Sequence, residues 1–126
     1  MQDRFNATLP ALIAQLTSPV GDMPLVIQAF GQLAVTVDDD ELWKPLNHQV
    51  LMQTREDNSR VKITGLRIIQ ELYNRLGDRL VPLLPETMPF IAELMEDSDE
   101  NVEATCRDTI KTIEQHLGES LQKFLK

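Results

Sequence analysis

The chain has 126 residues, of which 42% are hydrophobic, 25% are charged and 5% are aromatic, and its formal net charge is −8. This length and balance predict one folded domain with a buried core, and they exclude a wholly disordered chain. The excess of acidic residues argues against a general nucleic-acid-binding protein, and no apolar run approaches the roughly 18 residues that a membrane span needs.

Apolar residues recur at helical spacing in six segments along the chain. They predict helices over residues 3–17, 24–37, 41–55, 58–76, 86–96 and 100–117. We expect an all-α fold of about three antiparallel helix pairs, formed by residues 3–37, 41–77 and 85–118, in a single domain that covers residues 1–126. A tail from residue 119 onward would cap the last pair.

The segments between the predicted helices carry the residues that start and stop helices. The run from Thr17 to Asp22 is rich in Ser, Pro and Gly, which suit turns. The acidic run from Asp38 to Glu41 precedes the third helix, whose amino end favours negative charge. Asn58 or Ser59 is expected to cap the fourth helix, and Gly77 to end it in a left-handed conformation.

The second half of the chain repeats itself at a spacing of 41 residues. Six residues have identical counterparts one repeat later: Val61, Ile69, Leu76, Gly77, Leu80 and Leu84 recur as Val102, Ile110, Leu117, Gly118, Leu121 and Leu125. A period of this length is typical of an α-solenoid. Gly65 matches Cys106, so we predict that this position is small and buried, and that the only cysteine is a core thiol.

No sequence pattern predicts catalysis, a cofactor or a metal site. The five glycines form neither a P-loop nor a dinucleotide-binding fingerprint. His48 and His116 are too far apart in sequence for a local zinc motif. The acidic run from Glu96 to Glu103 lacks the glycine of the usual calcium-binding loop. We therefore expect neither an enzyme nor a small-molecule substrate.

Residues 55–84 are the only basic part of the chain, with six basic and four acidic residues. The candidate contacts to phosphate or to an acidic partner are Arg60, Arg67, Arg75 and Arg79. Arg60 and Arg67 lie on one helix face and the other two lie near its end, so the four would form a basic ridge. Alternatively they are ordinary solvated side chains, paired with Glu56, Asp57, Glu71 and Asp78.

Two apolar features lead to further expectations. Trp43, the only tryptophan, is predicted to lie in the core or to form a wedge between repeats. Phe5, Leu9 and Leu12 are expected to leave apolar surface exposed near the amino-terminal end, which would favour self-association.

The layout resembles HEAT repeats, in which each unit has two antiparallel helices, a proline in the first helix, an acidic turn, and a valine that opens the second helix. The resemblance covers nearly the whole chain and implies an α–α superhelix. HEAT units commonly carry an Arg just after that valine, packed near the acidic turn. Lys62 and Glu103 occupy these positions here, so we do not expect this contact in the third repeat.

Four runs are similar to a narrower family: Leu42–Asn47 followed by Gln49; Leu83–Glu86; Pro89–Asp97; and Leu117, Gly118, Glu119, Leu121 and Gln122. They resemble the carboxyl-terminal end of the HEAT repeat-containing protein 1 family, the large HEAT-repeat subunit of the small-subunit processome. The resemblance implies that the chain is a carboxyl-terminal fragment of a much longer protein.

The same resemblance implies a non-enzymatic nucleolar scaffold that acts in pre-rRNA processing and assembly of the small ribosomal subunit, and that supports rRNA transcription. The implied partners are processome proteins and a small nucleolar ribonucleoprotein, and no membrane is implied. Whether the chain also contacts pre-rRNA directly is left open by the resemblance. The alternative is a HEAT-repeat adaptor that binds only proteins, such as a nuclear transport receptor or a phosphatase scaffold. The fold alone does not distinguish the two.

Overall fold

The computed structural model describes residues 2–18, 23–118 and 120–121, and it shows no strand among them. The elements are α1 (Gln2–Thr17), α2 (Met23–Val37), α3 (Asp40–Gln53), α4 (Ser59–Leu76), the 3₁₀ helix η1 (Gly77–Leu83), α5 (Leu84–Leu94) and α6 (Glu100–Leu117). The six α-helices begin and end within two residues of the predicted bounds. The sequence analysis predicted no helix over the residues of η1.

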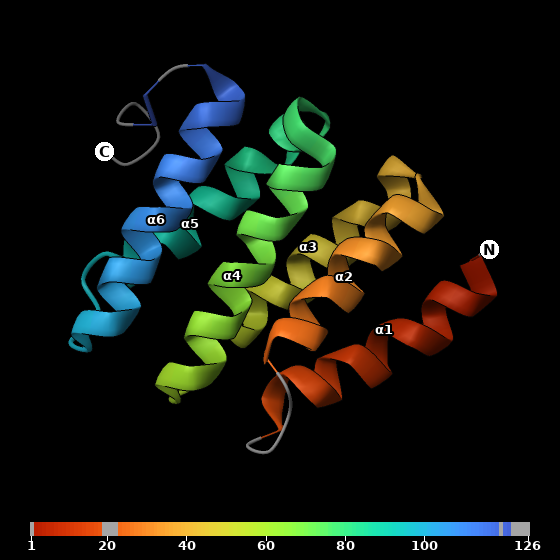
Figure 1. The fold of residues 1–126 in the computed structure, drawn as a ribbon, viewed down its shortest axis with the longest axis horizontal. Helices are drawn as coiled ribbons and strands as arrows, with labels where there is room; N and C mark the ends of the chain where they lie inside the picture. Colours follow the sequence, from red (N-terminus) through yellow and green to blue (C-terminus); the bar gives the residue numbers. More distant parts are fainter. Residues whose placement is uncertain (1, 19–22, 119, 122–126) are drawn as a thin grey trace.

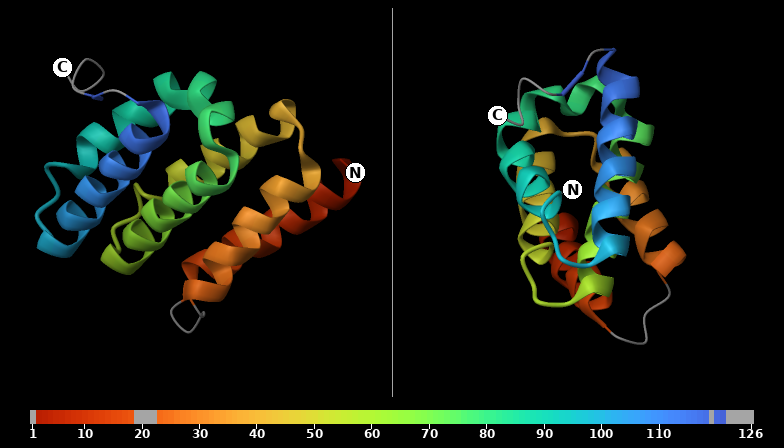
Figure 2. Two further views of the ribbon diagram at one scale, coloured as in Figure 1. Left: turned by 45° about the horizontal axis from the view of Figure 1, so that its top comes forward. Right: turned by 90° about the vertical axis from the view of Figure 1, so that its left-hand side faces the viewer.

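The helices form three antiparallel pairs that lie side by side (Figure 1). In end view, α2, α4 and α6 make one layer, and α1, α3 and α5 lie on the other side (Figure 2). Helix α4 packs extensively against α2 and α6, whereas α3 touches α1 and α5 along less of its length. The arrangement is the all-α solenoid that the repeat predicted, with a tightly packed α2–α4–α6 layer and a more open α1–α3–α5 layer.

Three helices begin at a side-chain cap that accepts hydrogen bonds from backbone amides of the first turn. Asn58 caps α4 by accepting from the amide of Val61 at 3.2 Å, as predicted. Asp39 caps α3, and Asp99 caps α6. Residues 58 and 99 are one 41-residue repeat apart, so the caps follow the same register as the core.

Two glycines end the long helices with positive φ. The left-handed conformation predicted for Gly77 is wrong, because its ψ of −134° lies outside the left-handed region, which Gly118 adopts instead. Gly77 has φ +59° at the end of α4, and Gly118 has φ +78° at the end of α6. Asp38 also has a positive φ, +43°, in the turn between α2 and α3. Asp adopts this region more readily than most residues, and the carboxylate of Asp38 accepts a hydrogen bond from Arg79 of η1.

The predicted apolar stripes form the core. Ile69 and Leu72 of α4 are almost fully buried, as are Val102 and Ile113 of α6, while Ile110, the counterpart of Ile69, is partly covered. The stripe prediction is therefore confirmed on both helices. The last matched residue of the repeat, 125, lies outside the described residues, as does most of the tail that was expected to cap the third pair.

The small-residue position of the repeat is also confirmed. A β-carbon on Gly65 would lie only 2.8 Å from Thr54 Cγ2, so α4 approaches the end of α3 closely at this point. Cys106 is fully buried and its thiol contacts the carbonyl oxygen of Ile91 at 3.4 Å. Burial raises the pKa of Cys106 to about 12, so the thiol stays protonated and unreactive near neutral pH.

The expectation that Phe5, Leu9 and Leu12 expose apolar surface is wrong. Their side chains are 2%, 7% and 8% exposed. They lie on the face of α1 that meets the other helices, since α1 contacts α2, α3 and α4. The exposed side of α1 is instead made of small or polar residues, among them Ala7, Ala11 and Ala14.

Candidate functional site

The candidate basic ridge lies on α4, where Arg60, Arg67 and Arg75 share one face because they are spaced by about two helical turns. Arg79 comes from η1 and faces the turn between α2 and α3 instead. The structure therefore groups three of the four predicted residues and separates the fourth.

Arg67 reaches toward the neighbouring helix α6. Its guanidinium lies 3.7 Å from Asp108 Oδ2 and donates to Gln70 Oε1 at 3.1 Å, and the side chain is 40% exposed. The expected partners of the arginines were carboxylates close in sequence. For Arg67 that expectation is wrong, because its ionic partner is 41 residues away and belongs to the next repeat.

Arg75 does pair with a nearby carboxylate, as expected. Its Nε donates to Glu71 Oε2 at 2.5 Å, and Nη1 donates to Gln32 Oε1 of α2 at 3.4 Å. The pair lies across Gly31 of α2, where an added β-carbon would fall 2.6 Å from Arg75 Nε. The missing side chain of Gly31 thus leaves the space that this ion pair occupies.

Arg79 covers the only tryptophan. Its guanidinium carbon lies 4.5 Å from the centre of the Trp43 ring, and Nη2 donates to Asp38 Oδ1 at 2.6 Å. The indole is 2% exposed and donates from Nε1 to the carbonyl oxygen of Ala34 at 2.9 Å. Trp43 is thus the predicted wedge between repeats, and the guanidinium of Arg79 stacks on its ring in a cation–π contact.

Polar contacts also join α4 to the third repeat. Lys62 Nζ donates to Asp97 Oδ2 at 2.7 Å, and the two side chains are only 20% and 11% exposed. The hydrogen bond from Lys62, followed by one from the amide of Asp99, holds the pKa of Asp97 below its usual range. Lys62 therefore makes the contact to an acidic turn that HEAT units commonly make with Arg.

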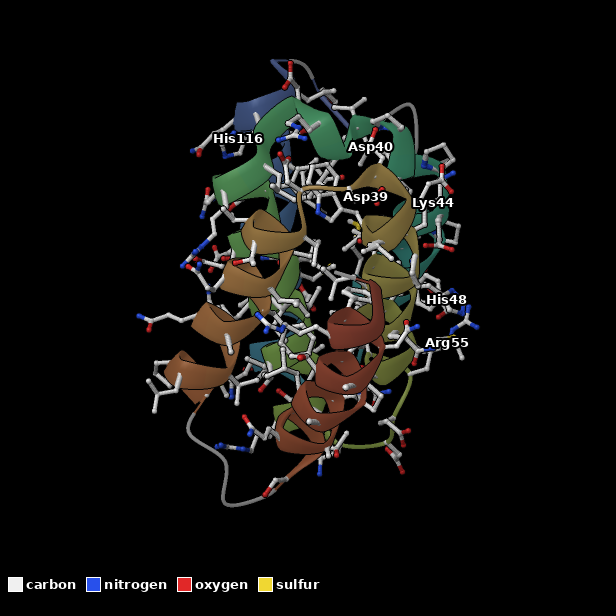
Figure 3. The ribbon with its side chains drawn as sticks, turned by 90° about the vertical axis from the view of Figure 1, so that its right-hand side faces the viewer. Asp39, Asp40, Lys44, His48, Arg55 and His116 are labelled. Atoms are coloured by element: carbon white, nitrogen blue, oxygen red, sulfur yellow. The ribbon has the colours of Figure 1, made fainter. Side chains whose placement is uncertain are left out.

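The same junction is joined on the other layer, between α3 and α5. Lys44 and His48 of α3 and Arg55 in the turn after it lie along one edge of the molecule (Figure 3), and His48 Nδ1 lies 3.3 Å from Glu86 Oε2. Arg55 Nε lies 3.3 Å from Glu93 Oε2. The sequence analysis missed these pairs, although each joins residues 38 positions apart, close to the repeat length.

Further polar contacts, from buried to exposed, complete this junction. Asn47 Nδ2 donates to Thr87 Oγ1 at 3.1 Å, and Gln70 Nε2 donates to Thr109 Oγ1 at 2.9 Å. Asn74 of α4 and His116 of α6 meet at 3.1 Å. The second and third helix pairs are thus held in one register by contacts spread along both layers.

Within the described part of the chain, no group of three His, Cys, Asp or Glu side chains is placed to hold a metal ion. In those same residues no helix is both long and apolar enough to cross a membrane. The charged groups described here meet oppositely charged or polar partners across helix junctions. This arrangement is suited to fixing the relative positions of helices and to presenting surfaces.

Comparison with known proteins supports a specific family. No family model matches the chain. A HEAT repeat-containing protein 1 homolog from Dictyostelium discoideum is 41% identical over 98% of this chain, and human HEAT repeat-containing protein 1 is 37% identical over 98% of it. U3 small nucleolar RNA-associated protein 10 of Schizosaccharomyces pombe is 35% identical over 97% of the chain.

The chain spans only 6% of the length of the first two relatives and 8% of the third. The aligned regions nevertheless cover 97–98% of this chain, through all three helix pairs and both layers. Together with the HEAT-like solenoid, they show that the chain belongs to the HEAT repeat-containing protein 1 family.

Proposed function

We propose that the chain is a non-catalytic scaffold segment in ribosome biogenesis, as part of the small-subunit processome in the nucleolus. Its role would be in pre-rRNA processing and small-subunit assembly, with support of rRNA transcription. The observation that carries this proposal is the 35% identity, over 97% of the chain, to a relative named for its association with U3 small nucleolar RNA. The partners proposed are processome proteins and a small nucleolar ribonucleoprotein.

The geometry supports a scaffold because charged side chains of α4 form ion pairs and hydrogen bonds that join neighbouring helix pairs. Lys62, Arg67 and Arg75 have partners in neighbouring helix pairs. Cys106 is buried and protonated. We further propose that residues 1–126 form one domain at the carboxyl-terminal end of a longer chain, as the family resemblance implies.

Direct contact with pre-rRNA is the finer part of the proposal, and we assign it to Arg60 and Arg67. Arg60 is exposed in the first turn of α4, and Arg67 is partly exposed on the same face. Arg75 and Arg79, the other two candidates, are assigned a smaller contribution, because the side chain of Arg75 is less exposed than that of Arg67 and Arg79 faces the turn between α2 and α3.

The experiment that tests the proposal is purification of the tagged endogenous protein under gentle conditions, followed by sequencing of the proteins and RNAs that accompany it. Recovery of pre-rRNA with small nucleolar ribonucleoproteins is expected. Recovery of transport cargo or phosphatase subunits without RNA would instead favour the alternative, a HEAT-repeat adaptor such as a nuclear transport receptor or a phosphatase scaffold.

The RNA contact is tested by reversing the charges in Arg60→Glu/Arg67→Glu and crosslinking the protein to RNA in cells. A matched control is Lys44→Glu/Lys111→Glu, which makes the same change in net charge at exposed positions on α3 and α6. The ridge variant should lose most crosslinked RNA and the control should keep it. Equal loss in both would point to net charge rather than to this face.

A further inference from the structure

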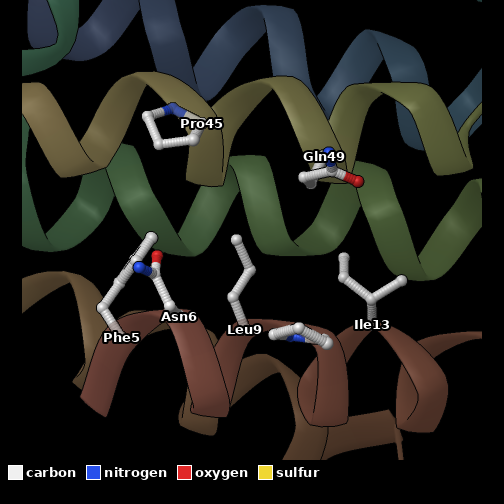
Figure 4. A pocket seen from close by; sticks show the side chains of 7 residues that line it. Phe5, Asn6, Leu9, Ile13, Pro45 and Gln49 are labelled. Carbon is white, nitrogen blue, oxygen red and sulfur yellow. The ribbon is translucent and has the colours of Figure 1, made fainter. Parts of the chain in front are cut away.

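An apolar groove lies between α1 and α3, on the open layer of the solenoid (Figure 4). Its volume is about 400 Å³, and it is lined by Phe5, Asn6, Leu9, Pro10, Ile13, Pro45 and Gln49. This volume falls within the usual range for binding pockets. The lining has no charged side chain, and its polar groups are two amides, one from each helix.

The groove is open because α1 and α3 are not joined as α3 and α5 are. Between α3 and α5, the side chains of His48 and Arg55 cross to Glu86 and Glu93. Among the side chains described for α1, from residue 4 to residue 17, no hydrogen bond or ion pair reaches α3. The space therefore stays free for an occupant from outside this part of the chain.

Both walls of the groove contain a proline inside a helix, Pro10 in α1 and Pro45 in α3. Proline has no amide hydrogen, so the carbonyl oxygens of Asn6 and Glu41, four residues earlier, do not receive the usual helical hydrogen bond. Each of these oxygens therefore lacks its helical donor and retains acceptor capacity. Asn6 itself lines the groove, and Glu41 lies one helical turn before Pro45. The amide side chains of Asn6 and Gln49 add donors and acceptors at the same edge.

We propose that this groove binds an extended, uncharged peptide segment of another protein, with one large apolar side chain inserted between the helices. Backbone N–H groups of an extended segment are free to donate to the proline-freed carbonyls, whereas those of a helix are already used. From Phe5 to Ile13 the groove runs for about 12 Å, the helical rise over eight residues. That length matches three or four residues of an extended chain.

The charge of the surroundings selects an uncharged ligand. The α1 wall, residues 5–17, contains no Asp, Glu, Lys or Arg, and the α3 side chains that line the groove, Pro45 and Gln49, are also uncharged. A charged side chain inserted between these lining residues would lose hydration without finding an ionic partner among them. The groove is thus complementary to a segment of apolar and small residues, independently of any contact between α4 and RNA.

The test uses the 126-residue chain and a capped tetrapeptide, acetyl-Ala-Leu-Phe-Ala-amide, in an NMR titration. Methyl and amide signals of Leu9, Ile13 and Gln49 should shift in a saturable way. A second peptide with N-methyl groups on alternate amides keeps the side chains but loses donors, and it should bind about tenfold more weakly or less. Equal binding of both peptides would overturn the proposal, because the carbonyls would then play no part.

Two variants locate the binding. Asn6→Trp places a large side chain at the edge of the groove and should abolish the shifts. Ala7→Trp makes a comparable change at an exposed position one residue along α1, outside the lining, and should leave them. Shifts that survive Asn6→Trp would place the peptide elsewhere and contradict the proposal.

Two rival occupants give different outcomes in the same experiment. A helical peptide that binds more tightly than its extended counterpart would show that the groove takes a helix. Signals that shift when the protein alone is concentrated, at the same residues, would show that a second copy of the chain fills it. Either result would overturn the assignment to an extended segment.

Discussion

The two junctions between helix pairs are built differently. At the second junction, between α3–α4 and α5–α6, polar contacts extend along both layers, from Lys62–Asp97 to Asn47–Thr87. At the first junction, between α1–α2 and α3–α4, the polar contacts described gather near the carboxyl end of α2, where Trp43 binds Ala34. The first junction therefore depends mainly on apolar packing and leaves a groove.

This difference explains why the 41-residue repeat is clear between the second and third helix pairs and weak in the first pair. A hydrogen-bonded pair needs particular atoms within about 3 Å, so it fixes both residue type and spacing. Apolar contacts tolerate other side chains of similar volume. The first pair, which has no charged residue in 5–18 or 23–37, keeps the helical layout but not the repeat positions.

The largest effect is expected from a charge in the helix that both junctions share. Leu72 of α4 is 1% exposed. Leu72→Asp would bury a carboxylate without a partner and cost about 4 kcal/mol or more, a large part of the stability of a domain this size. Circular dichroism should show an unfolded or partly unfolded chain at room temperature.

The exposed position Gln115 on α6 provides the control for that variant. Gln115→Asp adds the same negative charge and should leave the melting temperature nearly unchanged. If Leu72→Asp also melted at the normal temperature, the α4 stripe would not be the shared core of the two junctions.

The second largest effect is a loss of stability when a basic residue of α4 is replaced. Helix α4 has one such residue at each junction, so the two junctions are compared directly. Lys62→Met leaves the poorly exposed carboxylate of Asp97 without its main donor, and should lower the free energy of unfolding by about 2 kcal/mol. Arg75→Met removes a side chain that pairs mainly within its own helix, and should cost about 0.5 kcal/mol. Urea denaturation measures both, and equal losses would show that the junctions do not differ as described.

The sequence predicted the parts of the fold that repeat, and failed where the partner of a residue lies on another repeat. Helix spacing gave six helices, and the recurrence at 41 residues placed Gly65 and Cys106 in the core. Charge alone suggested a ridge that included Arg79, which instead covers Trp43. Proximity in sequence suggested local partners for Arg67, whereas its ionic partner comes from α6.

The groove between α1 and α3 was not predictable for a related reason. Pro10 and Pro45 were visible in the sequence, but their facing positions depend on how far the helices of the open layer spread apart. The exposure expected for Phe5, Leu9 and Leu12 near the amino-terminal end was wrong, because the sequence does not say how much of α1 the other helices cover. Both features are set by packing between helices rather than by helix propensity.

The third prediction compares Gly→Ala substitutions at two positions, Gly65, where the neighbouring side chain is fixed, and Gly31, where the neighbouring side chains are able to move. At Gly65, an added β-carbon would meet the methyl group of Thr54, whose hydroxyl is fixed to the carbonyl of Leu51 at 2.6 Å. Gly65→Ala should therefore cost about 1–2 kcal/mol, since the clash outweighs the gain in helix propensity. The thermal midpoint checks this expectation.

At Gly31, on the first junction, the added atom would meet only the flexible side chains of Arg75 and Glu71. These side chains are able to move, and the gain of about 1 kcal/mol in helix propensity offsets the weakened ion pair. Gly31→Ala should leave the thermal midpoint nearly unchanged. A loss as large as that of Gly65→Ala would show that the first junction is as rigid as the interior of the second pair.

The smallest effect is a shift in acid stability that belongs to the second junction alone. The hydrogen bond from Lys62 lowers the pKa of Asp97, and the Ser59 hydroxyl is the main cause of the lowered pKa of Asp99. A carboxyl group with a lowered folded-state pKa stabilises the protein above its unfolded value near 3.9, and this stabilisation is lost as pH falls through the folded value. In Lys62→Met the pKa of Asp97 should rise, so its contribution to stability is lost at a higher pH, while the pKa of Asp99 should change little.

Carboxyl carbon shifts followed by NMR across this pH range measure the two groups separately. If the two pKa values rose together, the acidic turn would be opening as a whole, and Lys62 would be holding the third repeat in place rather than only its own partner.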